Sequence, residues 1–123
     1  PGSYVSNNCV VGHCTEIKNS LMLPYSKAPH FNYVGDSILG HSVNLGAGAK
    51  ISNVRLDRRS IPIQFSDGNR ADSGLRKLGA LIGDKSEIGC NVVTNPGSVI
   101  PPSSAIPPNT VVTGHWNNRV GSR

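Results

Sequence analysis

Residues 82–112 read IGDKSEIGCNVVTNPGSVIPPSSAIPPNTVV, with an aliphatic or β-branched residue at every sixth position. The repeated positions are Ile82, Ile88, Thr94, Ile100, Ile106 and Val112. A period of six matches neither the 3.6-residue turn of an α-helix nor the two-residue alternation of a strand. It is typical of short strands separated by corners. The repeat therefore predicts a parallel β-helix whose successive coils stack on one another.

The same spacing occurs earlier in the chain. It includes Val5, Val11, Ile17 and Leu23, and then Leu39, Leu45 and Ile51. A small or β-branched residue often follows four positions later, as Cys9, Val43 and Ser86 do, which suits a narrow core. Three repeats make one coil of about 18 residues, with neighbouring coils about 4.8 Å apart. We therefore expect an all-β protein of about five coils.

The length of 123 residues indicates one domain. We expect the β-helix to span residues 4–117, with an inserted loop at about 52–81 and a tail at 118–123. Residues 1–3 are interpreted as a cloning remnant. No stretch approaches the ~18 apolar residues of a membrane span, and no signal peptide is visible. We therefore expect no membrane contact. Three cysteines without metal-ligand spacing favour a reducing, cytoplasmic setting.

The repeat is interrupted twice, and functional residues tend to lie where a regular scaffold is broken. Leu23 and Leu39 are 16 residues apart, where three repeats would take 18. We expect shortened corners there to push His30 and Tyr33 out of the ordinary pattern. The second interruption, residues 52–81, shows little sign of strand or helix. A loop of that length in a compact domain is usually functional or disordered.

The inserted loop concentrates positive charge. The net charge is +5, and six of the 12 lysines and arginines lie in this loop. They are Arg55, Arg58, Arg59, Arg70, Arg76 and Lys77. This concentration favours an anionic partner. Because Phe65 is the single aromatic residue of the loop, a phosphorylated small molecule or coenzyme fits better than nucleic acid.

His30 is the candidate catalytic residue, because histidine transfers protons near neutral pH. A histidine with a purely structural role is the alternative. The other histidines, His13, His41 and His115, are more typical of surface or corner positions. The spacing His-x4-His, expected of a zinc site on such a fold, does not occur. We therefore predict no bound metal.

Three motifs occur in the order found in a known family. They are Glu16-Ile17-Lys18-Asn19, His30-Phe31-Asn32-Tyr33-Val34-Gly35-Asp36 and Val43-Asn44-Leu45-Gly46-Ala47-Gly48. The chain resembles the C-terminal left-handed β-helix of bacterial N-acetylglucosamine-1-phosphate uridyltransferases, which acetylates glucosamine-1-phosphate. It also resembles the shorter β-helix tails of related sugar-1-phosphate nucleotidylyltransferases. The resemblance implies a left-handed coil and a homotrimer with sites in grooves between subunits.

The resemblance also implies roles for individual residues. His30 matches the general base, which takes a proton from the sugar amine as the amine attacks the thioester of acetyl-CoA. Positions matching sugar or phosphate contacts are Lys18, Tyr33, Asn44, Asn53 and Lys77, and Arg76 and Cys90 are expected near the coenzyme. We therefore predict a domain similar to sugar-1-phosphate N-acetyltransferases, with acetyl-CoA as co-substrate. The alternative is a non-catalytic β-helix that trimerises or regulates a sugar-1-phosphate nucleotidylyltransferase.

Two expectations concern the ligand groove of the resembled family. Proline pairs follow Ile100 and Ile106, at corners that would line the coenzyme groove. Proline lacks a backbone N–H, so contacts to acetyl-CoA are expected to differ there. The basic loop at residues 55–77 is expected to close over the groove of a neighbouring subunit.

Overall fold

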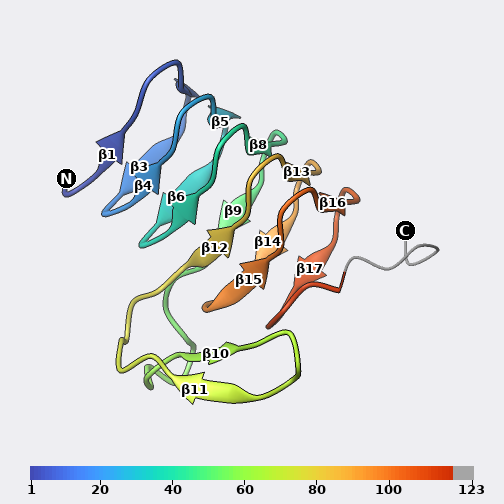
Figure 1. The fold of residues 1–123 in the computed structure, drawn as a ribbon. Coiled ribbons are helices and arrows are strands. Elements are labelled where there is room, and N and C mark those ends of the chain that lie inside the picture. Colours follow the sequence, from blue (N-terminus) through green and yellow to red (C-terminus); the bar gives the residue numbers. More distant parts are fainter. Residues whose placement is uncertain (118–123) are drawn as a thin grey trace.

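The computed structural model describes residues 1–117, which wind into a left-handed parallel β-helix (Figure 1). The predicted all-β fold is confirmed. Three sheets form the sides of a prism of five complete coils, and a sixth begins where His115 pairs with Val99. Within this described part there is no helix long and apolar enough to cross a membrane. The tail predicted at 118–123 lies outside the described residues.

Each coil contributes one strand to each sheet. Sheet A contains β1 (Tyr4–Val5), β4 (Leu21–Met22), β7 (Ile38–Leu39), β12 (Ala80–Ile82) and β15 (Ser98–Ile100). Sheet B contains β2 (Val10–His13), β5 (Lys27–His30), β8 (Asn44–Leu45), β13 (Glu87–Ile88) and β16 (Ala105–Ile106). Sheet C contains β3 (Glu16–Lys18), β6 (Tyr33–Gly35), β9 (Lys50–Ile51), β14 (Val93–Thr94) and β17 (Val111–Val112). Coils 1 to 5 begin at β1, β4, β7, β12 and β15.

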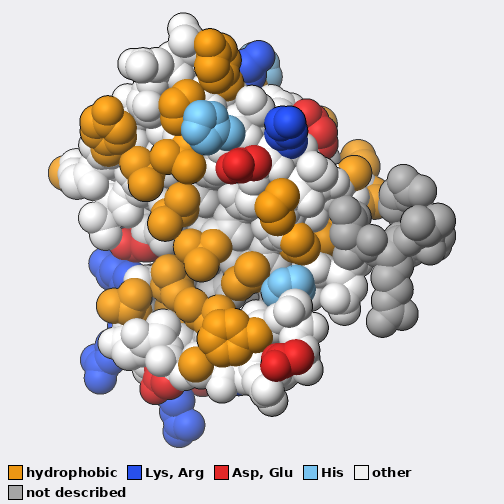
Figure 2. All heavy atoms as spheres, in the orientation of Figure 1, with side chains coloured by type: hydrophobic (Ala, Val, Ile, Leu, Met, Phe, Trp, Pro, Cys, Tyr) orange, Lys and Arg blue, Asp and Glu red, His pale blue; other side chains and the backbone are white. Residues whose placement is uncertain are grey.

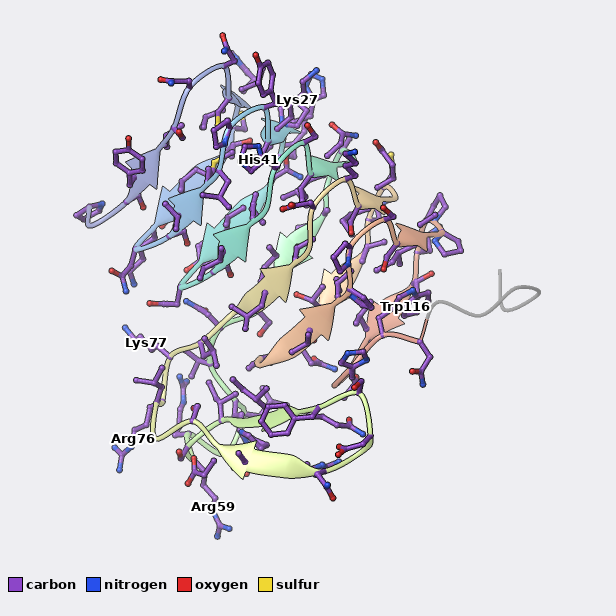
Figure 3. All side chains as sticks on the ribbon, in the orientation of Figure 1. Lys27, His41, Arg59, Arg76, Lys77 and Trp116 are labelled. Atoms are coloured by element: carbon purple, nitrogen blue, oxygen red, sulfur yellow. The ribbon has the colours of Figure 1, made fainter. Side chains whose placement is uncertain are left out.

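The core is a column of inward side chains, one large and one small from each strand. Large inward residues at most 3% exposed include Met22, Val34, Leu39, Leu45, Ile51, Ile82, Ile88, Ile100, Ile106 and Val112. Small ones include Ser26, Ser37, Ala49, Ser86, Ser98 and Ser104. Each large side chain contributes about 1.5–3 kcal/mol by leaving water. Trp116 packs against this core beyond the last coil (Figure 3).

The coils have two lengths. Paired residues are 17 positions apart in coils 1 to 3 and 18 apart between coils 4 and 5. Consequently Met22, fully buried, takes the inward place predicted for Leu23, which is only partly buried. The missing residue falls at the corner between sheets C and A. The predicted break around His30 and Tyr33 is therefore wrong in its position, because both stand at a regular corner.

The insert between β9 and β12 is an ordered lobe. It contains an antiparallel hairpin of β10 (Pro62–Gln64) and β11 (Arg70–Asp72), so the expectation of little secondary structure is wrong (Figure 1). Three-residue strands are too short to show an alternating pattern in sequence. Ile61, fully buried, anchors the lobe. At Gly97, with φ of +81°, an added Cβ would lie 2.5 Å from the Pro62 carbonyl oxygen, so glycine permits the hairpin to pack here.

Candidate functional site

A groove follows the corner between sheets B and C across four coils. Its volume is about 700 Å³, within the range of small-molecule pockets. The groove is lined by Cys14, Thr15, Glu16, Phe31, Asn32, Tyr33, Ala47, Gly48, Lys50, Cys90 and Asn91. Parallel pairing places Glu16, Tyr33 and Lys50 on successive coils. The groove therefore combines an acid, a phenol and a cation along one edge of the prism.

His30 ends β5 at the rim of this groove, beside the lining residues Phe31 and Asn32. Its backbone N–H donates to Asn32 Oδ1 (3.1 Å), and its carbonyl accepts from the Gly48 N–H (3.0 Å). Asn32, almost fully buried, also donates to two carbonyls of coil 3. The His30 side chain is exposed, and no residue within 1–117 hydrogen-bonds to its ring. Its backbone is thus held while the imidazole is open to a ligand.

A ladder of polar side chains supports Tyr33 from the corner between sheets C and A. Asn53 Nδ2 donates to the Tyr33 hydroxyl (3.1 Å) and to Asp36 Oδ2 (2.7 Å). Asp36 Oδ1 accepts from Asn19 Nδ2 (2.6 Å). A Cβ at Gly35 would lie 2.5 Å from the Tyr33 hydroxyl oxygen, so the absent side chain leaves room for the ring. These hydrogen bonds therefore hold the side chain of Tyr33, which lines the groove, in place.

The predicted sugar contacts fall on two faces. Lys18 lies on β3 beside Gly35 and so shares sheet C with Tyr33. Asn53 lies just beyond that sheet and reaches the Tyr33 hydroxyl. Asn44 lies on sheet B, where its Nδ2 donates to Glu87 Oε1 (3.3 Å). Lys18, Tyr33 and Asn53 therefore lie together on the sheet C side of one chain. Asn44 lies on the neighbouring sheet B side.

The predicted coenzyme contacts, Cys90 and Arg76, and the remaining predicted substrate contact, Lys77, lie apart within one chain. Cys90 is an exposed free cysteine that lines the groove. Lys77 borders a different hollow against sheet A, and Arg76 is exposed on the insert. Figure 3 shows Arg76 pointing outward from the insert, away from the coils. These two cations could meet the groove only if it belonged to another copy.

Sequence reasoning missed Asn19, Asp36, Asn32 and Gly35 as supports of the site. The signal for the ladder is the 17-residue interval that separates Asn19, Asp36 and Asn53. With the coil of about 18 residues that the sequence predicts, these three residues do not align on successive coils. For Asn32, the signal is a polar residue at an inward position where small residues are usual.

The outer faces of the three sheets differ in polarity. Outward positions carry Tyr4, Leu21, Ile38, Leu81 and Val99 on sheet A, but include Lys27 and Glu87 on sheet B, and Glu16 and Lys50 on sheet C. Tyr4 is 65% and Ile38 42% exposed. Figure 2 shows hydrophobic side chains gathered along this face. An exposed apolar stripe of this kind is typical of a protein–protein contact.

Comparison with known proteins finds relatives much longer than this chain. It is 44% identical over 87 residues to a bifunctional sugar-1-phosphate nucleotidylyltransferase/acetyltransferase of Sulfurisphaera tokodaii, covering 71% of this chain and 21% of that protein. It is 36% identical over 97 residues to the bifunctional protein GlmU of Methanococcus maripaludis, covering 79% and 23%. The chain thus spans about a fifth of the length of these relatives. No protein-family model matches it.

Among solved structures, PerB from Caulobacter crescentus in complex with CoA and GDP-perosamine is similar in fold. The TM-score is 0.60 at 16% identity, covering 98% of this chain and 50% of PerB. At that identity the similarity concerns the fold alone. The repeat, the stacked coils and the sequence identities together lead to one conclusion. The chain is a hexapeptide-repeat β-helix homologous to part of the bifunctional sugar-1-phosphate nucleotidylyltransferase/acetyltransferases.

Proposed function

We propose that the chain transfers an acetyl group from acetyl-CoA to the amine of an amino-sugar phosphate, with His30 as general base. The observation that carries the proposal is the groove between sheets B and C. His30, whose side chain is exposed, ends β5 at the rim of this groove, and Tyr33, which the polar ladder holds in place, lines it. PerB, which is similar in fold, binds CoA and GDP-perosamine, and ligands of that chemistry would suit such a groove.

The sugar phosphate is assigned to the sheet C side of the groove. Lys18 supplies a cation for the phosphate, and Tyr33 and Asn53 supply hydrogen-bonding groups for sugar hydroxyls. Asn44 on sheet B of a neighbouring copy would contact the same ligand. The residues present therefore suit a small, polar, anionic substrate.

Acetyl-CoA is assigned to the part of the groove beyond His30. Ala47 and Gly48 are small and leave space above His30, and Cys90 follows on the next coil. The proline pairs after Ile100 and Ile106 do not belong to the groove lining. Altered coenzyme contacts at those corners stay a prediction.

The proposed chemistry needs one proton acceptor and no side-chain nucleophile. The amine nitrogen attacks the thioester carbonyl carbon, the new N–C bond forms and the C–S bond breaks. His30 takes the proton that the amine loses, and CoA leaves as the thiolate. General-base catalysis of this kind contributes about 10²–10⁴ in rate.

The proposed assembly is a homotrimer in which the apolar face of sheet A is covered by neighbouring copies. Covering Tyr4 and Ile38 would remove exposed apolar area from water. Lys77 borders this face, so a neighbouring copy packed here would meet Lys77 and Arg76. That arrangement supports the expectation that the insert reaches the groove of another subunit.

The function is tested by measuring CoA thiol release from acetyl-CoA in the presence of glucosamine-1-phosphate. We expect His30→Ala to lower kcat by at least about 100-fold with unchanged circular dichroism and sedimentation. His41→Ala is the matched control, because His41 is exposed at a corner outside the groove, and its activity should be unchanged. No thiol release by the unmutated protein with any amino-sugar phosphate would contradict the proposal and favour the non-catalytic β-helix.

A further inference from the structure

A second pocket lies between the insert and the coils, at the corner between sheets C and A. Its volume is about 520 Å³, and it shares no lining residue with the groove of the proposed active site. One wall is a polar column of Ser52, Asn95 and Thr113, from coils 3 to 5. Asn95 Nδ2 donates to Thr113 Oγ1 (2.8 Å), which leaves the side-chain Oδ1 of Asn95 available to a ligand.

The opposite wall is the hairpin, which contributes Pro62 and Arg70. The hairpin packs against the coils at Gly97, where an added Cβ would lie 2.5 Å from the Pro62 carbonyl oxygen, and hydrogen bonds within the insert hold its base together. Ile61 is fully buried, its N–H donates to the Leu75 carbonyl (2.8 Å), and its carbonyl accepts from the Ser73 N–H (3.0 Å). Because both walls are packed, the pocket exists without a ligand, and binding need not bear the cost of ordering the insert.

The charge on the pocket is uneven. Arg55 forms a side-chain pair with Asp57 (Nη2–Oδ2, 2.6 Å), so its charge is largely compensated. Arg70 has no ion-pair partner among residues 1–117, and it is exposed at the rim. Pro62 and Pro96 add apolar surface on facing sides. The pocket thus offers an unpaired guanidinium, a polar column and a slot between prolines.

We propose that this pocket binds a phosphorylated ring compound of about the size of a nucleoside monophosphate. Arg70 holds the phosphate, because a guanidinium binds phosphate oxygens through two parallel N–H groups. The ligand hydroxyls exchange hydrogen bonds, as donors and as acceptors, with the side chains of Ser52, Asn95 and Thr113. The ring lies against Pro62 and Pro96. This inference does not depend on the activity proposed for the groove.

The test is isothermal titration calorimetry of the 123-residue chain with UMP, uridine and inorganic phosphate as probes. We expect UMP to bind with one site per chain, and uridine and phosphate each to bind at least about tenfold more weakly. Arg70→Ala should weaken UMP binding by about tenfold or more, and Arg70→Lys should restore part of it. Arg59→Ala is the matched control, since Arg59 belongs to the insert but not to the pocket lining.

Three results would overturn the inference. The first is equal UMP affinity in Arg70→Ala and the unmutated protein. The second is an equal loss in Arg59→Ala, which would indicate general attraction to a basic lobe. The third is inorganic phosphate binding as tightly as UMP, which would indicate an anion patch without a ring site. Tyr33→Phe, altered in the other groove, should leave the UMP affinity unchanged, and so separates this pocket from the proposed active site.

Discussion

The first three coils and the last two share one architecture but differ by one residue at the corner between sheets C and A. After coils 1 and 2 the inward step across this corner is five residues, and the corner carries Asn19 or Asp36; Asn53 takes the equivalent place in coil 3, where the insert begins. In the last coils the step is six, and Gly97 and Gly114 stand there with positive φ. The side chains of the short corner hold Tyr33, whereas at the long corner Gly97 and Gly114 lack side chains and the insert packs against them.

The largest effect is expected where the short corner loses its carboxylate. Asp36→Ala removes two hydrogen bonds, to Asn19 and Asn53, and frees Asn53 from its position beside Tyr33. Charge-assisted hydrogen bonds contribute about 1.5–3 kcal/mol each, but Asn19 is exposed and water replaces part of this. We expect the free energy of unfolding in urea to fall by about 2 kcal/mol and acetyl transfer to fall about tenfold or more.

The matched variant is Asn19→Ala, which removes the donor on the far side of Asp36 from Tyr33. It should cost about 1 kcal/mol and leave acetyl transfer nearly unchanged. Equal loss of activity in both variants would show that the ladder acts on the whole corner rather than on Tyr33.

The next effect concerns Gly97 at the long corner. Gly97→Ala places a Cβ 2.5 Å from the Pro62 carbonyl oxygen and forces an alanine to a φ of +81°. The backbone strain is about 1 kcal/mol, and the hairpin must move to relieve the clash. We expect trypsin to cleave the arginine-rich insert at least about threefold faster, while the far-ultraviolet spectrum of the coils stays unchanged.

Gly68→Ala separates strain from contact, because Gly68 has a φ of +89° with nothing within 4 Å of the added Cβ. It carries the same strain at the tip of the hairpin but no clash with a coil. If both variants accelerate cleavage equally, packing on Gly97 does not hold the insert in place.

A smaller effect is expected inside the last coils. Thr94 occupies an inward position that Val34, Ile51 and Val112 fill elsewhere on sheet C, and its Oγ1 is buried without a hydrogen-bond partner in residues 1–117. Thr94→Val should raise the free energy of unfolding by about 1 kcal/mol. Thr110→Val should lower it by about 1 kcal/mol, because Thr110 Oγ1 donates to the Pro107 carbonyl (2.7 Å). A loss of stability in Thr94→Val would indicate that the hydroxyl has a partner.

The smallest effect is the pH response of the insert. Hydrogen bonds from the Arg55 side chain, followed by the Arg59 backbone N–H, lower the pKa of Asp57 from 3.8 to about 2. Because the folded pKa is depressed, its contribution is complete above pH 3.8 and is lost as the pH falls through about 2. A carboxyl titration by NMR should show a midpoint near 2, which Arg55→Ala moves toward 3.8. A midpoint near 3.8 without mutation would show that the pair does not persist.

Much of the scaffold follows from local pattern, but its register does not. The six-residue spacing after Ile82 is regular, and each inward residue predicted there is buried. Before Leu39 the spacing includes five-residue steps, so Leu23 and Met22 exchange roles. Neighbouring apolar residues are equally good inward residues in sequence. The choice between them is made only when strands pair with the next coil.

The candidate site residues also divide into those that sequence motifs predict and those that only the structure identifies. Lys18, Tyr33 and Asn53 could be proposed from motifs, and the structure brings them together on one side of the prism. Asp36 and Gly35 could not, because their role depends on contacts across two coils. Arg76 and Lys77 lie away from the groove, since the insert leaves and rejoins the coils between sheets C and A, and Lys77 borders sheet A.

The sequence by itself determined the type of core. One large and one small inward residue in each strand admit only short parallel strands and tight corners, and this local requirement is written into the six-residue repeat. Only the tertiary structure decided where the short and long corners face and what packs on them. Those contacts join residues a coil or more apart, such as Asn53 with Tyr33 and Gly97 with Pro62. The energies of these contacts depend on how the coils stack on one another, which a local sequence pattern cannot predict.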